Sequence, residues 1–509
     1  MRKTNQLRTG VLLSYINLGI SCIIPFLYTP IMMHMLGQTE YGLYCLANSV
    51  ISYLTLLSFG FGSTIIRYVS KYRAEENKEA VYRIFGFFLQ LYVLLGILVF
   101  IVGLIVSNNV EAIFNKGLTQ AEINKIHILI IIMAFNTALS FPISVFSSII
   151  TSYERYVYRK FVDMISTVAA PIFNLIALYM GFASVGMSIA STILQILMLP
   201  LNVIYCIKVL NIKPKFKRIP YPLMKEMLGF SFYIFLATVV DMLFWSTDKV
   251  ILGMLASSAA VAVYNIGGTF NNMVISLSTS ITGVLTPKIT GMVAKNVSKE
   301  QLTELFIRIG RLQYCVIALI VSGFAAFGQS FIQLWAGSEY ADSYWIAILT
   351  MFPLCIPLIE NTGLSIVVAQ NKHKFRSLVY LTIAIINVIS TYMVVPYWGG
   401  IGAALCSCIA YLVGQGLIMN VYYYKVTGIN IPLFWKNIGK MSLVPGIMLI
   451  LGTVINERIA LNNWISFFTS VIVYTLIYCV SMYRFILNQY EKDVVRKPLQ
   501  AIKKRIVRG

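Results

Sequence analysis

The chain has 509 residues, of which 58% are hydrophobic and 12% are charged, and its mean hydropathy is +0.78. A soluble core cannot hide that much apolar surface, so the composition excludes an ordinary soluble domain. The net charge of +21 would suggest nucleic acid in a soluble protein. Here the basic residues lie between long apolar stretches, so we expect a membrane protein with no nucleic-acid partner.

Many apolar runs are long enough to cross a hydrocarbon core, and strand edges cannot be exposed to lipid. We therefore predict an all-α polytopic membrane protein with about fourteen transmembrane helices. The predicted spans lie near 11–34, 43–66, 84–107, 126–150, 162–180, 185–207, 228–247, 260–286, 312–335, 345–369, 378–396, 399–424, 441–456 and 464–483. The first span is interpreted as a retained helix, because no small-residue cleavage site follows it.

The basic residues predict the orientation of the chain. Of the 40 lysines and arginines, all but Lys116, Lys125, Lys249 and Arg458 fall on one side of the predicted spans. Cytoplasmic segments are enriched in basic residues, so we expect both termini in the cytoplasm and a location in a bacterial inner membrane. An even number of spans agrees with this orientation.

No pattern for catalysis or for a bound metal is present. The three histidines lie on separate segments without a partner at ligand spacing, and no phosphate-cradling glycine loop occurs. We therefore expect no metal and no cofactor, and a secondary transporter rather than an enzyme.

The chain also resembles itself at an offset of a little over two hundred residues, as in transporters built from two similar halves. Matching pairs are 36–39 with 255–258, Lys78-Glu79 with Lys299-Glu300, Phe141-Pro142 with Phe352-Pro353, Asn174 and Tyr179-Met180 with Asn387 and Tyr392-Met393, and Val185-Gly186 with Ile401-Gly402. Six helices in each half make the repeats parallel. We predict an N-terminal lobe (1–210), a C-terminal lobe (211–424), two further helices (425–486) and a basic cytoplasmic tail (487–509).

Two stretches carry a resemblance to a known family: LGQTEYGLY at 36–44 and TDKVILG at 247–253. They resemble the polysaccharide transporters, or oligosaccharide flippases, of the multidrug/oligosaccharidyl-lipid/polysaccharide exporter superfamily, whose fold is that of the multidrug and toxin extrusion proteins. The resemblance implies transfer of undecaprenyl-diphosphate-linked oligosaccharide repeat units to the outer leaflet, for O-antigen, capsule or exopolysaccharide synthesis. It also implies alternating access between the two lobes.

Three other functions stay open. Lipid II flippases resemble this family but usually carry an Arg-Asp pair in the first helix, and multidrug antiporters commonly place an acid there, whereas residues 11–33 contain no charge. A membrane-embedded glycosyltransferase or polymerase would need a sizeable outer loop, and the longest predicted one is 108–125.

Ionisable residues within a span are costly unless they face protein or water, so they are functional candidates. Asp241 in the seventh span and Glu360 in the tenth are candidates for binding a coupling proton or cation. Each is equally compatible with a buried structural pair. Pro353 and Pro357 remove backbone donors near Glu360 and are expected to kink its helix.

Four further polar candidates lie near the outer end of the seventh span and within the eighth span. For Asp248 and Lys249 we favour an architectural or gating role, with separate partners, because adjacent residues point in different directions around a helix. Asn271 and Asn272 are candidates for hydrogen bonds to sugars or to other helices.

A diphosphate cargo needs cationic partners, and Arg67 and Arg311 are the candidates nearest the cytoplasmic side. Both also fit the ordinary role of a positive-inside anchor. The segment 299–309 carries an apolar stripe and is predicted to lie on the membrane surface. The tail is expected to bind anionic lipid, and a polysaccharide polymerase is a candidate partner.

Overall fold

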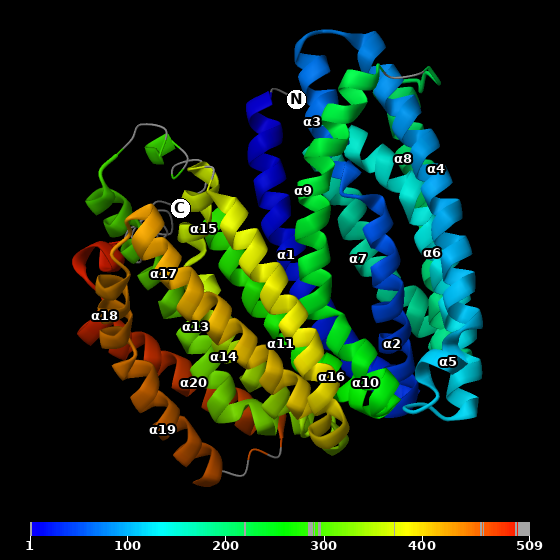
Figure 1. The fold of residues 1–509 in the computed structure, drawn as a ribbon. Helices are drawn as coiled ribbons and strands as arrows, with labels where there is room; N and C mark the ends of the chain where they lie inside the picture. Colours follow the sequence, from blue (N-terminus) through cyan, green and yellow to red (C-terminus); the bar gives the residue numbers. More distant parts are fainter. Residues whose placement is uncertain are drawn as a thin grey trace, which may run out of the picture. The chain divides into compact units, whose positions relative to one another are not determined.

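The computed structural model describes residues 3–217, 220–283, 289, 291–293, 297–370, 372–458, 461, 463–493 and 496. The described residues form helices and contain no strand, which confirms the predicted all-α class (Figure 1). The chain divides into two compact units. Unit 1 comprises Met1–Asn265 and Val388–Gly400, and unit 2 comprises Ile266–Asn387 and Ile401–Gly509.

Unit 1 is a bundle built around one long central helix, α6 (Gln120–Ser152), which packs against α2, α3, α4 and α8. Figure 1 shows α4 and α6 side by side along their length. The other helices of this unit are α1 (Lys3–Leu36), α2 (Gln38–Leu54), α3 (Phe61–Ala74), α4 (Lys78–Asn108), α5 (Val110–Phe114), α7 (Tyr156–Tyr179), α8 (Ala183–Ile204), α9 (Tyr221–Trp245), α10 (Thr247–Leu255) and the first turns of α11 (Ser258–Gly283).

Helix α4 shows how a membrane-spanning helix divides its two faces. Phe85, Phe88 and Val99 are at most 1% exposed and pack inside the bundle. Leu94, Ile97, Leu98, Ile101 and Ile105 form an exposed apolar stripe at helical spacing. A contiguous apolar stripe of this kind would be a liability in water, so this face is expected to contact lipid.

Unit 2 is organised around α13 (Lys299–Trp335), which packs against α14 (Ser343–Ile359), α18 (Ile431–Met441), α19 (Leu443–Arg458) and α20 (Trp464–Ser481). The last two helices share a core with α13, in which Phe327, Met448 and Tyr474 are buried. The Tyr474 hydroxyl donates to Ser322 Oγ at 2.8 Å. The unit also contains α15 (Asn361–Ala369), most of α16 (His373–Tyr411) and the short α17 (Asn420–Tyr422).

Fewer than fourteen described helices meet the criteria of length and apolarity for a membrane span. Eleven described helices are long and apolar enough to cross a membrane, or twelve if the bent pair α14 and α15 is one span. The predicted spans 378–396 and 399–424 fall in one helical range, Lys374–Thr427, interrupted at Gly399 by a φ of 52°. The predicted span 260–286 corresponds to α11, whose described part ends at Gly283 and does not meet the criterion. Fourteen therefore stays a prediction.

Paired positions of the sequence repeat occupy matched environments. Ser191 Oγ of α8 donates to Asn174 Oδ1 of α7 at 3.3 Å. Asn387 Nδ2 donates to Ser407 Oγ at 3.2 Å across the kink at Gly399. Each asparagine thus contacts a serine of the helical segment that follows it in its own unit. The tyrosine-methionine pairs that follow are exposed in both halves. The match is incomplete, because Phe141 is buried whereas Phe352 is 62% exposed.

The amphipathic pattern of the segment 299–309 predicted a helix on the membrane surface. This prediction is wrong. The segment forms the first turns of α13, and its apolar stripe is buried, with Phe306 fully enclosed. The Phe306 ring packs against Phe434 of α18 at 4.6 Å between centroids. The stripe therefore faces protein rather than lipid. The basic tail from residue 497 onward lies outside the described residues.

Candidate functional site

The family-like stretch 36–44 forms the junction of α1 and α2, and Glu40 holds this junction to two other helices. The Glu40 carboxylate accepts hydrogen bonds from the Ser184 hydroxyl and from the Ser184 backbone N–H, the latter at 3.2 Å. It also pairs with Lys125 Nζ at 2.5 Å. A carboxylate at the start of α8 satisfies backbone donors that have no intrahelical partner. Glu40 therefore ties α2, α6 and α8 together.

Two glycines of the family-like stretches allow close packing in the same region. A Cβ atom on Gly42 would lie 1.9 Å from the carbonyl oxygen of Ser258, and one on Gly253 would lie 2.5 Å from a methyl of Leu46. Any side chain at Gly42 would push the backbone of residue 258 away. Helix α2 thus packs closely against both α10 and the start of α11.

Asp248 and Lys249 make separate polar contacts within unit 1. Asp248 is fully buried and accepts a hydrogen bond from the Tyr264 hydroxyl. Lys249 Nζ donates to Asn265 Oδ1 at 3.1 Å, and the Asn265 amide donates to the Tyr41 hydroxyl at 2.9 Å. This chain of contacts links α10, α11 and α2. It supports the architectural role proposed for both residues.

Glu360 lies at the break between α14 and α15, which are bent by 45°. The residue is 1% exposed, and neither carboxyl oxygen has a hydrogen bond of normal geometry to a described residue. The Asn420 amide lies near the carboxyl group but donates to the carbonyl oxygens of Gln415 and Gly416, both at 3.0 Å. A buried carboxyl group in this position has unused acceptor capacity for a proton or a cation.

The two prolines expected to kink this helix both lie inside α14, with Pro353 buried and Pro357 partly buried. Each removes one backbone donor in the two turns before Glu360. Beyond the break, Gly363 N–H donates to the Glu360 carbonyl at 2.7 Å. The chain therefore changes direction where Glu360 is held.

The other polar candidates of the spans lie in different surroundings. Asp241 is exposed on α9. Asn271 is 1% exposed on α11 and donates to Thr350 Oγ1 at 2.8 Å, which joins α11 to α14 inside unit 2. Asn272 is exposed. Of the two asparagines, Asn271 is thus engaged between helices, and Asn272 has the accessible side chain.

Of the two candidate arginines, one is likewise exposed and the other is buried and paired. Arg67 is exposed on α3, and its guanidinium stacks on the Phe230 ring at 4.4 Å. Arg311 is 8% exposed on α13 and is paired with the Glu491 carboxylate, with Nε–Oε1 and Nη2–Oε2 distances of 2.6 and 2.9 Å. Glu491 thus occupies the guanidinium of Arg311, one of the two predicted candidates for binding the cargo diphosphate.

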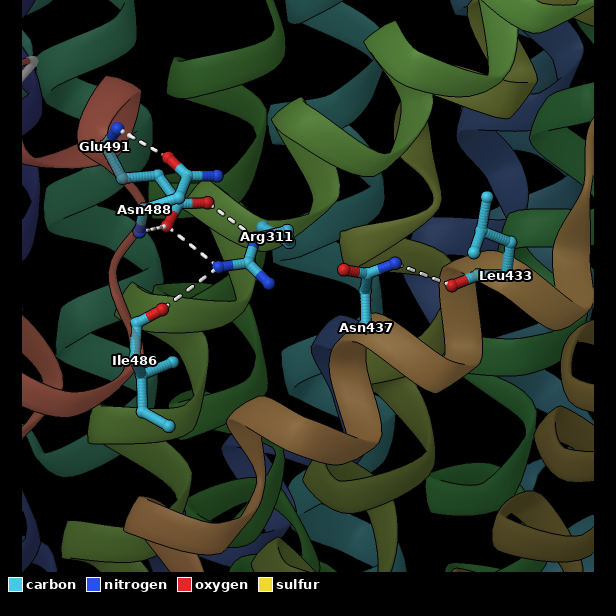
Figure 2. Close-up of polar contacts among 6 residues, drawn as sticks. All are labelled: Arg311, Leu433, Asn437, Ile486, Asn488 and Glu491. Atoms are coloured by element: carbon cyan, nitrogen blue, oxygen red, sulfur yellow. Dashed lines mark hydrogen bonds and ion pairs between the residues drawn. The ribbon is translucent and has the colours of Figure 1, made fainter.

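Figure 2 shows the segment that delivers Glu491 to Arg311. Asn488 and Glu491 cap each other: Asn488 N–H donates to the Glu491 carboxylate at 2.8 Å, and Glu491 N–H donates to Asn488 Oδ1 at 2.9 Å. The Ile486 carbonyl accepts from Arg311 at 3.3 Å. The sequence analysis assigned residue 491 to the basic cytoplasmic tail without a partner, because no local pattern around it indicates Arg311.

The comparisons with known proteins agree with this architecture. The model of the family described as polysaccharide biosynthesis protein matches residues 7–293. An uncharacterized membrane protein of Methanocaldococcus jannaschii is 21% identical over 501 residues, with 96% of each chain covered. The capsular polysaccharide biosynthesis protein CapF of Staphylococcus aureus is 28% identical over 179 residues, which cover 35% of this chain and 42% of CapF.

Two solved structures illustrate the shared fold. A lipid II flippase MurJ in an inward closed conformation has a TM-score of 0.73 at 17% identity and covers 96% of this chain and 99% of its own. An inward-facing multidrug resistance transporter of the same superfamily has a TM-score of 0.63 at 14% identity, covering 82% and 99%. The fold and the family match confirm the resemblance carried by residues 36–44 and 247–253, and the chain belongs to the polysaccharide biosynthesis protein family of multi-pass membrane proteins.

Proposed function

We propose that this protein is a flippase that moves undecaprenyl-diphosphate-linked oligosaccharide repeat units from the cytoplasmic to the outer leaflet of a bacterial inner membrane. The product would serve O-antigen, capsule or exopolysaccharide synthesis. The family match over residues 7–293 is the observation that carries this proposal. The lipid II flippase fold supports it, because that relative by its name handles a lipid-linked saccharide.

The proposed mechanism is alternating access by two helical lobes, with both chain termini in the cytoplasm. Binding of cargo can shift such an equilibrium only if the cargo interacts differently with the two states. An ion gradient would then reset the protein. Glu360 is our first candidate for the coupling group, because its buried carboxyl oxygens are unused at the bend between α14 and α15. Asp241 is the second candidate.

Contacts to the cargo diphosphate are proposed for Arg67, which is exposed. Asn272 is the corresponding candidate for the sugars. Arg311 remains a candidate only in a state in which Glu491 has left it. A polysaccharide polymerase remains the proposed protein partner.

The experiment that tests the function is reconstitution of the full chain in liposomes with undecaprenyl-diphosphate-linked oligosaccharide. Movement is scored as accessibility of the glycan to a membrane-impermeant lectin added outside. We expect protein-dependent exposure of the glycan. Absence of any protein-dependent movement, in vesicles where the protein is correctly inserted, would contradict the proposal.

The second candidate function is antiport of drugs or small cations, which the multidrug transporter fold favours. The same vesicles distinguish it when a fluorescent organic cation replaces the glycolipid. Cation uptake without lipid movement would establish the antiporter. Movement of lipid II in preference to the oligosaccharide lipid would instead identify a lipid II flippase.

A further inference from the structure

An open cavity with many polar lining residues lies within unit 1, between α6, α7 and α8. It has a volume of 490 Å³, within the range of about 300–1,000 Å³ typical of small-molecule sites. Ten of its fifteen lining residues are polar, although all three helices are candidate membrane spans. Polar side chains within a span are costly unless they meet protein, water or a ligand. Most of these lining residues bond to other groups of the protein, so the case for an occupant depends on the lining groups that retain hydrogen-bonding capacity.

The charge of the cavity limits the class of that occupant. Its charged lining residues, Arg159 and Asp163, form an ion pair at 2.9 Å within α7. Arg159 Nη1 also donates to Ser147 Oγ of α6 at 2.6 Å. The two charges offset each other, and the guanidinium is engaged twice. A diphosphate needs an excess of cationic donors, so the cavity fits a neutral ligand better than an anionic one.

The cavity retains hydrogen-bonding capacity. Asn202 lines it, is 2% exposed, and its Oδ1 has no hydrogen bond to a described residue. Its Nδ2 donates to the Met198 carbonyl at 3.4 Å, which is a long contact. A buried polar atom without a partner costs free energy. The Oδ1 atom of Asn202 is therefore an acceptor that a hydroxyl donor of a ligand would satisfy.

The remaining polar residues of the lining are amides and hydroxyls, including Gln195 and Ser166. Each such group both donates and accepts hydrogen bonds. A sugar carries many hydroxyls of the same dual character and no charge, so it can satisfy these groups together. An acyl chain would leave the Asn202 Oδ1 acceptor unpaired, which is disfavoured.

We propose that the α6–α7–α8 cavity is the subsite for a neutral sugar residue of the lipid-linked cargo. The inference rests on the proposed flippase function and names the part of the cargo that this chain recognises inside unit 1. The turn at 153–155, which joins α6 to α7 near Arg159, belongs to a segment that the charge pattern assigns to the cytoplasm. The subsite would thus lie toward the leaflet in which cargo is loaded.

The test compares binding of two kinds of lipid to the full chain in nanodiscs. The probes are undecaprenyl diphosphate without sugar and three lipids in which it carries glucose, galactose or N-acetylglucosamine. We expect at least one sugar-bearing lipid to bind roughly tenfold more tightly than the sugar-free lipid, since each tenfold corresponds to about one well-formed hydrogen bond. Asn202→Leu and Gln195→Leu should reduce that ratio toward one and leave binding of the sugar-free lipid unchanged.

Gln90→Leu is the matched control, because Gln90 is exposed on α4 and does not line the cavity. A second readout uses Ser166→Cys, whose labelling by a small maleimide should be slowed by the sugar-bearing lipid and not by the sugar-free lipid. Equal affinity of the wild type for sugar-bearing and sugar-free lipid would overturn the subsite. So would an affinity ratio that Asn202→Leu and Gln195→Leu leave unchanged, if residue 166 is also not protected from labelling. Failure of both kinds of lipid to bind would instead contradict the proposed function.

Discussion

Glu360 and Arg311 are both buried in unit 2, and the surroundings of the two charged groups differ. Arg311 meets a carboxylate in bidentate geometry, together with a backbone carbonyl. Glu360 has no equivalent cationic partner among the described ion pairs. A buried charge without a partner is expensive, so we expect the Glu360 carboxyl group to bind a proton or a cation.

Glu360→Gln should uncouple transport from an imposed pH gradient. Glutamine keeps the size of the side chain but cannot gain or lose a proton. We expect glycolipid movement in vesicles to respond to the gradient in the wild type and to be independent of it in the variant. Glu304→Gln, an exposed position on α13, is the control. If Glu360→Gln and Asp241→Asn together leave the pH response intact, neither residue is the coupling group.

Arg311→Gln or Glu491→Gln alone should destabilise the protein by about 3–5 kcal/mol, because each leaves one buried charge without its partner. The loss of stability is measured as the decrease in Tm in detergent, which is monitored by size-exclusion chromatography of heated samples. The double variant with Met at both positions removes both charges and should recover most of the stability. Equal losses in the double and the single variants would show that the ion pair does not explain the effect.

At the scale of the elements, the family-like stretches act through close helix contacts. Glu40 joins three helices, and Gly42 lets α2 approach the backbone of Ser258. Helices in a membrane gain little from the hydrophobic effect between themselves, so small residues and interhelical hydrogen bonds carry much of their association. A stretch with both features is expected to define the packing of unit 1.

Gly42→Ala should therefore lower the stability of the protein by about 1–3 kcal/mol, because the added methyl forces a backbone shift at residue 258. The matched control is Gly229→Ala in α9, where a Cβ would meet nothing within 4 Å. In that helix, alanine is expected to be neutral or slightly stabilising. The yield of monodisperse protein after heating distinguishes the two. A Gly42→Ala variant as stable as Gly229→Ala would contradict the packing role.

At the scale of the whole molecule, the sidedness of the chain is the property on which the transport direction depends. The distribution of basic residues predicts that the turn at 75–77 lies in the cytoplasm and the segment 108–125 outside. The proposed loading of cargo from the cytoplasmic leaflet requires that assignment.

Single cysteines measure this sidedness directly. In a background without reactive native cysteines, Asn115→Cys should react with a membrane-impermeant maleimide added to intact cells. Glu75→Cys should react only after the membrane is permeabilised. Both positions are exposed, so accessibility within the protein does not limit either reaction. The reverse pattern would invert the proposed topology and the direction of transport.

The amino-acid sequence by itself determined the class of the molecule, its helical content, its family and the predicted sidedness. The first two depend on the length and apolarity of single segments, because any helix that crosses a bilayer needs such a run, whatever it packs against. The sidedness depends on the distribution of lysine and arginine between segments. These are properties of the chain in one dimension, and a motif such as that at 36–44 is readable in the same way.

Only the tertiary structure decided the partners. The Arg311–Glu491 pair joins residues 180 positions apart, and the contact of Gly42 with residue 258 and the cavity between α6, α7 and α8 depend on how helices pack. The surface role expected for 299–309 was wrong for the same reason: an apolar stripe looks alike whether it faces lipid or another helix. Periodicity in a sequence shows that a face of a helix is apolar, and only the packing of the helices shows whether lipid or another helix covers that face.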